Sequence, residues 1–232
     1  MKKITINLSY YNQVDVLRRH INGWKSWSKD LLDKFSFCIV DDCSKIKASD
    51  IAENIGYDNM DLSVYRVETD LYCNIAGVRN LSAQECKTPW MVILDMDTII
   101  SSDLAESLLM HTDTNEGTCF KFNRRVLENT DHIKHNRIHP AVCMIRASDY
   151  WKVGGCEEDL VGNYGYTDPS FWYRSQGILS IRTLSHLYLD YIPAGEASID
   201  RNTGINEKLF TEKKNNGSWS DDYIRFSWTK EI

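Results

Sequence analysis

The first hundred residues alternate short apolar runs with longer segments in which apolar residues recur at helical spacing. The segment from Val14 and the segment from Asn74 to Cys86 have the helical spacing, and Pro89 ends the second one. The apolar runs have the length and the β-branched or aromatic content of strands. These runs are Lys3–Leu8, Phe35–Val40, Leu62–Val67 and Trp90–Leu94. Strands that alternate with helices predict an α/β fold with a central, mainly parallel sheet.

The second half of the chain has a less regular pattern. It predicts strands over residues 118–123, 142–146 and 178–189, and helices over 147–153 and 167–176. No repeat, low-complexity linker or domain boundary divides the chain. We therefore expect one domain over residues 1–212, with a regular half (1–100) and an irregular half (101–212). Residues 213–232 would form a C-terminal tail, in which the polar segment 213–220 is a mobile loop.

Composition and charge narrow the classes of protein. A chain of 232 residues with 42% hydrophobic content can bury one substantial core. The net charge of -6 and the lack of a basic stripe give no reason to expect a nucleic-acid partner. The seven cysteines are odd in number and contain no C-x-x-C, which favours free thiols in a reducing compartment. No apolar run has the length of a signal peptide or a spanning helix, so we expect a soluble cytoplasmic protein.

Acidic residues follow two of the predicted strands. Asp41 and Asp42 come directly after the second strand, and Asp95 and Asp97 come after the fourth. Ligands of such sheets bind beyond the carboxyl ends of the strands. Residues two apart on an extended strand point to the same side, so Asp95 and Asp97 can face one ligand. Carboxylates select Mg²⁺ or Mn²⁺, and these ions usually bind substrate phosphates as well. The alternative is that both acids face solvent or cap the next helix.

Five motifs occur in one order along the chain: I-V-D-D-C-S, A-G-V-R-N, V-I-L-D-M-D, V-G-G-C-E-E and Y-G-Y-T-D. Together they resemble the family 2 glycosyltransferases of the GT-A fold, over roughly residues 3 to 190. The resemblance implies metal-dependent transfer of a sugar from a UDP- or GDP-linked donor to a hydroxyl acceptor such as a glycan, with inversion. Residues 1–100 would then hold the nucleotide sugar and residues 101–212 the acceptor. The sugar, the base, the acceptor and the oligomeric state stay open.

The resemblance also implies roles for single residues on the donor side. Ser9, Tyr10 or Tyr11 would contact the nucleotide base together with Asp41 and Arg79, whereas Asp42 would be structural. Asp95 would meet the ribose and the shell of a Mn²⁺ or Mg²⁺ ion. Asp97 would bind the ion directly. His186, on a late strand, is a candidate further ligand, although a lone histidine among apolar residues is also a common structural residue.

On the acceptor side, Asp168 resembles the family's catalytic base. It would take the proton of the acceptor hydroxyl. The sequence departs from the family pattern, because Thr167 stands where a glutamate is usual and Pro169 follows the aspartate. Asp168 before a proline could instead be a helix cap. Two further groups would border the acceptor site, unless they are structural: the aromatic residues Tyr164, Tyr166, Trp172 and Tyr173, and the histidines His132, His135 and His139.

Three other functions fit parts of the sequence. The D-M-D-T-I run matches the first motif of HAD-type phosphatases, but it lies on the fourth strand here, and Asp221 and Asp222 follow no apolar strand. A nucleotidyltransferase would carry a glycine-rich loop after the first strand, where this chain has Ser9 to Gln13. A non-catalytic domain that binds a carbohydrate or nucleotide is the third alternative, and the change at Thr167 is its main support.

Overall fold

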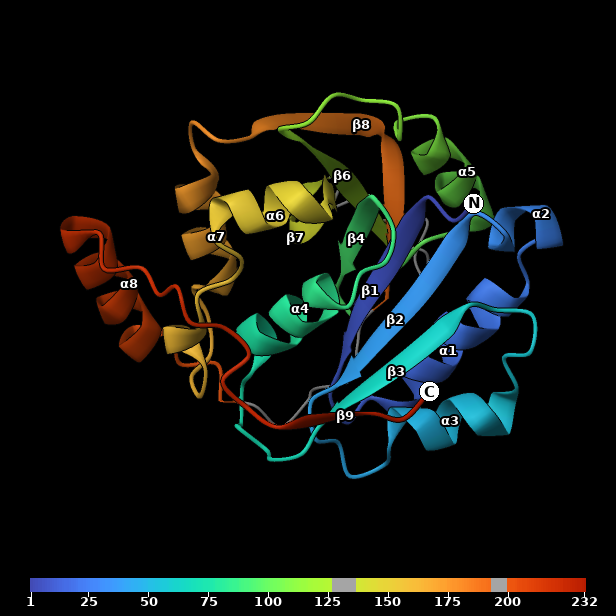
Figure 1. The fold of residues 1–232 in the computed structure, drawn as a ribbon, viewed down its shortest axis with the longest axis horizontal. Helices are drawn as coiled ribbons and strands as arrows, with labels where there is room; N and C mark the ends of the chain where they lie inside the picture. The colour runs from blue at the N-terminus through green and yellow to red at the C-terminus, as the bar shows by residue number, and fades with distance from the viewer. Residues whose placement is uncertain (127–136, 193–199) are drawn as a thin grey trace.

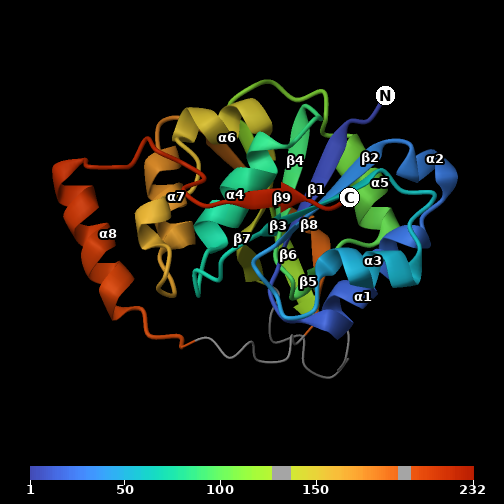
Figure 2. The ribbon, with the colours of Figure 1, turned by 60° about the horizontal axis from the view of Figure 1, so that its bottom comes forward.

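The computed structural model describes residues 1–126, 137–192 and 200–232. Its centre is a mixed nine-stranded sheet in the order β5-β8-β6-β7-β4-β1-β2-β3-β9 (Figure 1). Helices cover both faces: α1 and α3 lie on one side of the sheet, and α4 and α6 lie on the other (Figure 2). The prediction of an α/β fold is confirmed.

The elements have the following bounds. The strands are β1 Ile4–Tyr10, β2 Phe35–Asp41, β3 Leu62–Val67, β4 Trp90–Leu94, β5 Thr98–Ile99, β6 Thr118–Val126, β7 Arg137–Arg146, β8 Ser180–Tyr191 and β9 Trp228–Lys230. The α-helices are α1 Val14–Lys25, α2 Lys29–Leu32, α3 Ala48–Ile55, α4 Ile75–Gln84, α5 Ser102–Leu109, α6 Ala147–Val153, α7 Thr167–Ser175 and α8 Gly204–Asn216. A 3₁₀ turn covers Glu158–Leu160.

Strands β1 to β4 form the parallel centre of the sheet. Ile4 of β1 pairs with Phe35 of β2 on one side and with Trp90 of β4 on the other. All five residues of β4 are buried, as expected for a strand covered by helices on both faces. Beyond β4 the sheet becomes mixed, because β7 runs antiparallel to β4 and to β6.

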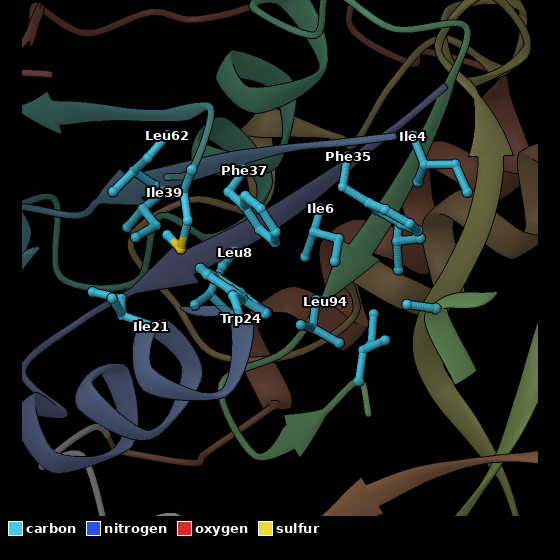
Figure 3. Close-up of a cluster of buried hydrophobic side chains, with 14 of the residues drawn as sticks. Ile4, Ile6, Leu8, Ile21, Trp24, Phe35, Phe37, Ile39, Leu62 and Leu94 are labelled. Carbon is cyan, nitrogen blue, oxygen red and sulfur yellow. The ribbon is translucent and has the colours of Figure 1, made fainter. Parts of the chain in front are cut away.

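The larger core lies between the sheet and α1, α3 and α5. Trp24 of α1 stacks on Phe37 of β2 with ring centroids 4.7 Å apart. Apolar residues of β1, β2 and β4 surround this pair (Figure 3). A second cluster on the opposite face joins Tyr150 of α6 to Phe171 of α7. Helices packed against both faces of the sheet leave the carboxyl ends of β1, β2 and β4 as the edge where a ligand can enter.

Several segments differ from the sequence-based expectation. Residues 48–55, for which no element was predicted, form α3 and bury Ile51 and Ala52. Strand β7 begins at Arg137, five residues earlier than expected. Segment 213–220 is not a loop throughout, because α8 continues to Asn216 and ends at Gly217, which has a left-handed conformation. Residues of the expected tail also form β9, which pairs antiparallel with β3.

Within the ranges that the structure describes, no helix combines the length and the apolar character needed to cross a membrane.

Candidate active site

A cavity of about 310 Å³ opens beyond the carboxyl ends of β1, β2 and β4. Its wall includes most of the residues that the sequence singled out. They are Ser9, Tyr10, Tyr11, Arg79, Asp95, Asp97 and Asp168. Segments far apart in the chain thus contribute to one site, because the parallel strands all end at this edge.

The acidic pair Asp95 and Asp97 lies in a tight turn between β4 and β5, not on an extended strand. The Thr98 backbone N–H and side-chain hydroxyl both donate to the Asp95 carbonyl, at 3.1 and 2.9 Å. Met96 between the two acids turns into the core with 7% exposure. The expectation that both carboxylates face one side holds, but the turn causes it rather than strand alternation.

His20 of α1 forms a hydrogen bond to the backbone of this turn. It is fully buried, and its Nε2 lies 3.0 Å from the Met96 carbonyl oxygen. Burial lowers the pKa of His20 to about 4, against the opposing effects of the Met96 hydrogen bond and Asp97. The ring is therefore neutral at physiological pH, and its Nε2–H donates to Met96. This contact fixes the backbone between the two acids.

Arg79 of α4 joins the two sides of the cavity. Its guanidinium donates from Nη2 to Asp95 Oδ1 at 2.7 Å and from Nη1 to Asp168 Oδ1 at 2.6 Å. The side chain is 6% exposed, whereas the two carboxylates are 26% and 32% exposed. Burial disfavours the charged form, but the Asp168 and Asp95 carboxylates outweigh it and raise the pKa of Arg79. The guanidinium therefore stays charged and holds the two acids at a fixed separation.

His139 of β7 is the histidine that lies beside the acidic turn. One nitrogen of its ring and one oxygen each of Asp95 and Asp97 lie within 4.8 Å of one another. The Nδ1 atom accepts from the backbone N–H groups of Ala141 and Val142, at 3.2 and 3.0 Å. A neutral ring with a lone pair on Nδ1 carries its proton on Nε2. That Nε2 lies 3.7 Å from Asp97 Oδ1, so the imidazole presents an N–H to the carboxylate.

His186, the expected metal ligand, lies elsewhere. It is exposed on β8, and its charge acts together with burial to lower the pKa of His111 at the end of α5. It is absent from the group formed by Asp95, Asp97 and His139. Of the three histidines expected near the acceptor, His132 and His135 fall outside the described residues.

Asp41 and Asp42, at the end of β2, have exchanged the positions that we expected for them. Asp41 is fully buried and faces away from the cavity: it accepts from the Ser44 and Ala48 backbone N–H groups at 2.7 and 3.0 Å, and from Arg66 at 2.8 Å. Asp42 lines the cavity instead. Its Oδ2 accepts from the Asn74 N–H at 3.3 Å, and its buried Oδ1 has no hydrogen-bond partner among the described residues. Burial raises the pKa of Asp42 to about 6.

The aromatic residues near Asp168 divide into two groups. Tyr164 and Tyr166 line the cavity. Trp172 donates from Nε1 to the Pro140 carbonyl at 2.8 Å, and Tyr173 packs against Phe210 of α8, so both stabilise the surroundings of α7.

Gln13 and Arg201 line the cavity, although the sequence had assigned no role to either of them. Gln13 carried a usable signal, because it lies three residues after the end of β1, at the edge where the ligand binds. Arg201 lies in a segment without a recognisable motif. His139 had been expected near the acceptor, and in the structure it lies beside Asp95 and Asp97.

Comparison with solved structures identifies the class of protein. S. aureus TarS 1–349 in complex with UDP-GlcNAc superposes with a TM-score of 0.70 at 14% identity, over 94% of this chain and 68% of that one. The mannosyltransferase PcManGT from Pyrobaculum calidifontis, in complex with GDP-Man and Mn²⁺, gives 0.64 at 14% identity over 84% and 58%. GalNAc-T7 with UDP, GalNAc and Mn²⁺ gives 0.66 at 14% identity over 84% and 45%. The fold is that of the GT-A glycosyltransferases.

The family model described as glycosyl transferase family 2 matches residues 5–177. The chain belongs to this family. No curated protein matches the sequence.

Proposed function

We propose that the protein is a metal-dependent, inverting glycosyltransferase that moves a sugar from a UDP- or GDP-linked donor to a hydroxyl acceptor such as a glycan. The observation that carries the proposal is the cavity in which Asp95, Asp97 and Asp168 meet, with Arg79 bridging the first and the last. Two acids are thus available for the donor, and a third lies across the cavity for the acceptor.

The donor set suits a hard divalent cation. Asp97 Oδ1 is buried and has no hydrogen-bond partner among the described residues, which is costly unless a ligand satisfies it. Asp95 and Asp97 would hold Mn²⁺ or Mg²⁺, with further ligands from water and the diphosphate. When bound, the ion offsets the charge of the departing nucleoside diphosphate. His139, rather than His186, lies with Asp95 and Asp97 in this group. Its Nε2 faces Asp97 Oδ1 from 3.7 Å, beyond hydrogen-bond distance, so we place it in the outer shell of the ion.

Asp168 is the proposed general base. Its Oδ1 is held by Arg79, and its Oδ2 makes no hydrogen bond to any described residue, so one oxygen is available to accept the hydroxyl proton. The hydroxyl oxygen would attack the anomeric carbon as its proton moves to Oδ2, while the bond from that carbon to the diphosphate oxygen breaks and the nucleoside diphosphate leaves with the electron pair. One displacement of this kind inverts the configuration. Asp168 lies in the first turn of α7, and that helix fixes the position of its carboxylate at the cavity wall.

Asp42, rather than Asp41, is the proposed contact for the nucleotide base. Uracil and guanine both present a ring N–H on their pairing edge, and the unpartnered Oδ1 of Asp42 can accept it. Asp41 cannot, because its two oxygens already accept three hydrogen bonds in a fully buried position. Ser9 and Tyr11 line the same cavity and complete the donor wall.

Incubation with Mn²⁺ and a panel of UDP- and GDP-sugars tests the proposal. A donor should raise the melting temperature only when Mn²⁺ is present, and it should be hydrolysed slowly or transferred to an acceptor. Binding without hydrolysis or transfer to any of a broad set of glycan acceptors would favour the non-catalytic alternative. Phosphatase activity on p-nitrophenyl phosphate that Asp95→Asn abolishes would favour the phosphatase.

A further inference from the structure

The residues that line the cavity carry an imbalance of charge. They include four carboxylates, those of Asp42, Asp95, Asp97 and Asp168, against two guanidinium groups, those of Arg79 and Arg201. Arg79 is already engaged by two of the carboxylates. A nucleoside diphosphate adds further negative charge to this acidic wall. One divalent ion offsets the excess of two charges on the wall but not the charge of the diphosphate, so a cation of the wall that is not engaged by carboxylates has to face the diphosphate.

Arg201 is available for that role. It is exposed, and it forms no hydrogen bond or ion pair with any residue in the described ranges. Its guanidinium presents a planar fork of donors that matches two phosphate oxygens at once. Arg79 cannot be released for the same purpose without leaving Asp95 and Asp168 unpaired.

The backbone around Arg201 is anchored at two points of the cavity wall. The Asp200 N–H donates to the hydroxyl of Tyr72, a residue of the cavity wall, at 2.7 Å. Thr203 packs against Gly165, also of the cavity wall, so closely that a Cβ added to Gly165 would lie 2.8 Å from the Thr203 methyl carbon. Arg201 lies between these two anchors, which hold its backbone against the cavity wall.

The first turn of α8 strengthens the second anchor. Asn206 is fully buried and donates from Nδ2 to the carbonyls of Leu160, Asn163 and Gly165, at 3.0, 2.9 and 2.9 Å. Asn163 and Gly165 belong to the glycine-rich segment of residues 162–168, and Leu160 lies in the 3₁₀ turn before it. The position of Arg201 is thus tied to the same segment that positions the proposed base.

We propose that Arg201 binds the diphosphate of the nucleotide-sugar donor and supplies the positive charge that the acidic cavity lacks. The assignment rests on the proposed function, because it needs a diphosphate in this cavity. Arg201 would contact the phosphate oxygens and would not contact the nucleotide base, whose proposed partner is Asp42.

The test compares a nucleotide with its nucleoside. Binding of UDP in Mn²⁺ is measured by calorimetry, and binding of uridine by ligand-detected NMR, for the wild type, Arg201→Gln and Arg201→Lys. GDP and guanosine replace them if the wild type prefers guanine. Arg182→Gln, an exposed change on β8 outside the cavity wall, is the matched control. Arg201→Gln should weaken UDP binding by about tenfold to a hundredfold, the effect of a charge-assisted hydrogen bond, and leave uridine binding unchanged.

Arg201→Lys should give an intermediate loss, because it keeps the charge and loses the fork. The inference is overturned if Arg201→Gln binds UDP within about twofold of the wild type, which is less than any charge-assisted hydrogen bond would give. It is also overturned if UDP and uridine lose affinity equally, since that pattern indicates a role in the fold or at the base. Failure of the wild type to bind either UDP or GDP would instead refute the proposed function.

Discussion

Replacing Asp42 with asparagine changes the hydrogen bonding at the proposed base site while keeping the shape of the side chain. Asp42 is 6% exposed, and its Oδ1 meets no partner among the described residues. A hydrogen bond to a charged acceptor contributes roughly 1.5–3 kcal/mol, and one to a neutral acceptor roughly 0.5–1.5 kcal/mol. Asp42→Asn should therefore weaken UDP binding by about tenfold. Cytosine has a ring nitrogen that accepts where uracil donates, so the new amide N–H should improve CDP binding.

The pH dependence provides a second readout on the same residue. Burial, with smaller contributions from Asp70 and Asp41, raises the pKa of Asp42 to about 6. The ionised carboxylate is a stronger acceptor for the ring N–H than the protonated acid, so affinity should be constant above that pKa and fall as the pH drops through it. Uridine is the appropriate ligand, because phosphate groups themselves titrate near pH 6. The decline should disappear in Asp42→Asn.

Calorimetry with UDP, CDP and GDP at pH 7.5 and NMR titration with uridine from pH 5 to 8 measure both effects. Asp103→Asn, an exposed change on α5, is the control. An Asp42→Asn protein that keeps full UDP affinity, does not gain CDP affinity and retains the pH profile of the wild type would refute the assignment of Asp42 to the base.

Three further predictions concern the acids and their partners. Asp168→Asn should slow transfer by about 10²- to 10⁴-fold at unchanged donor affinity, as expected for loss of a general base; turnover at the wild-type rate would remove Asp168 from the mechanism. Asp97→Ala should abolish Mn²⁺-dependent nucleotide binding. His139→Gln should weaken Mn²⁺ binding only by about tenfold to a hundredfold, as changes in the outer shell of a metal site do. If calorimetry shows equal losses of Mn²⁺ affinity for the two variants, His139 is a metal ligand. Arg79→Gln should lower the free energy of unfolding by about 1–3 kcal/mol, less than for a fully buried pair because both carboxylates are partly exposed. Urea unfolding that shows no change would contradict the bridging role.

The parallel half of the fold was predictable because its signal is local. Each of the strands β1 to β4 is an apolar run that ends in polar residues, and their order along the chain defines the ligand-binding edge. The motif order also identified Asp95, Asp97 and Asp168 as a group, and all three line one cavity.

The remaining features depend on contacts between distant segments. Asp41 and Asp42 are adjacent and chemically identical, and only the position of Arg66 and the start of α3 show which of them turns inward. His139 differs from His186 through a backbone contact at its Nδ1, which no spacing in the sequence reveals. The helix α8 has a weak apolar pattern, because its two buried residues are the polar Asn206 and Lys213, which bind backbone carbonyls and the Asp159 carboxylate.

Strand β9 affects the order in which the molecule can be completed during synthesis. It pairs with β3, whose residues precede it by more than 150 positions, and it lies along the outer edge of the sheet (Figure 1). Glu158 is 4% exposed and accepts from Asn80 of α4 and from the backbone N–H groups of Ile224 and Arg225. Until residues 224–230 leave the ribosome, β3 has an open edge and Glu158 lacks two of its donors. The edge of the sheet and the hydrogen bonds of Glu158, which also holds Asn80 of α4, are therefore completed only after this distant segment has been synthesised.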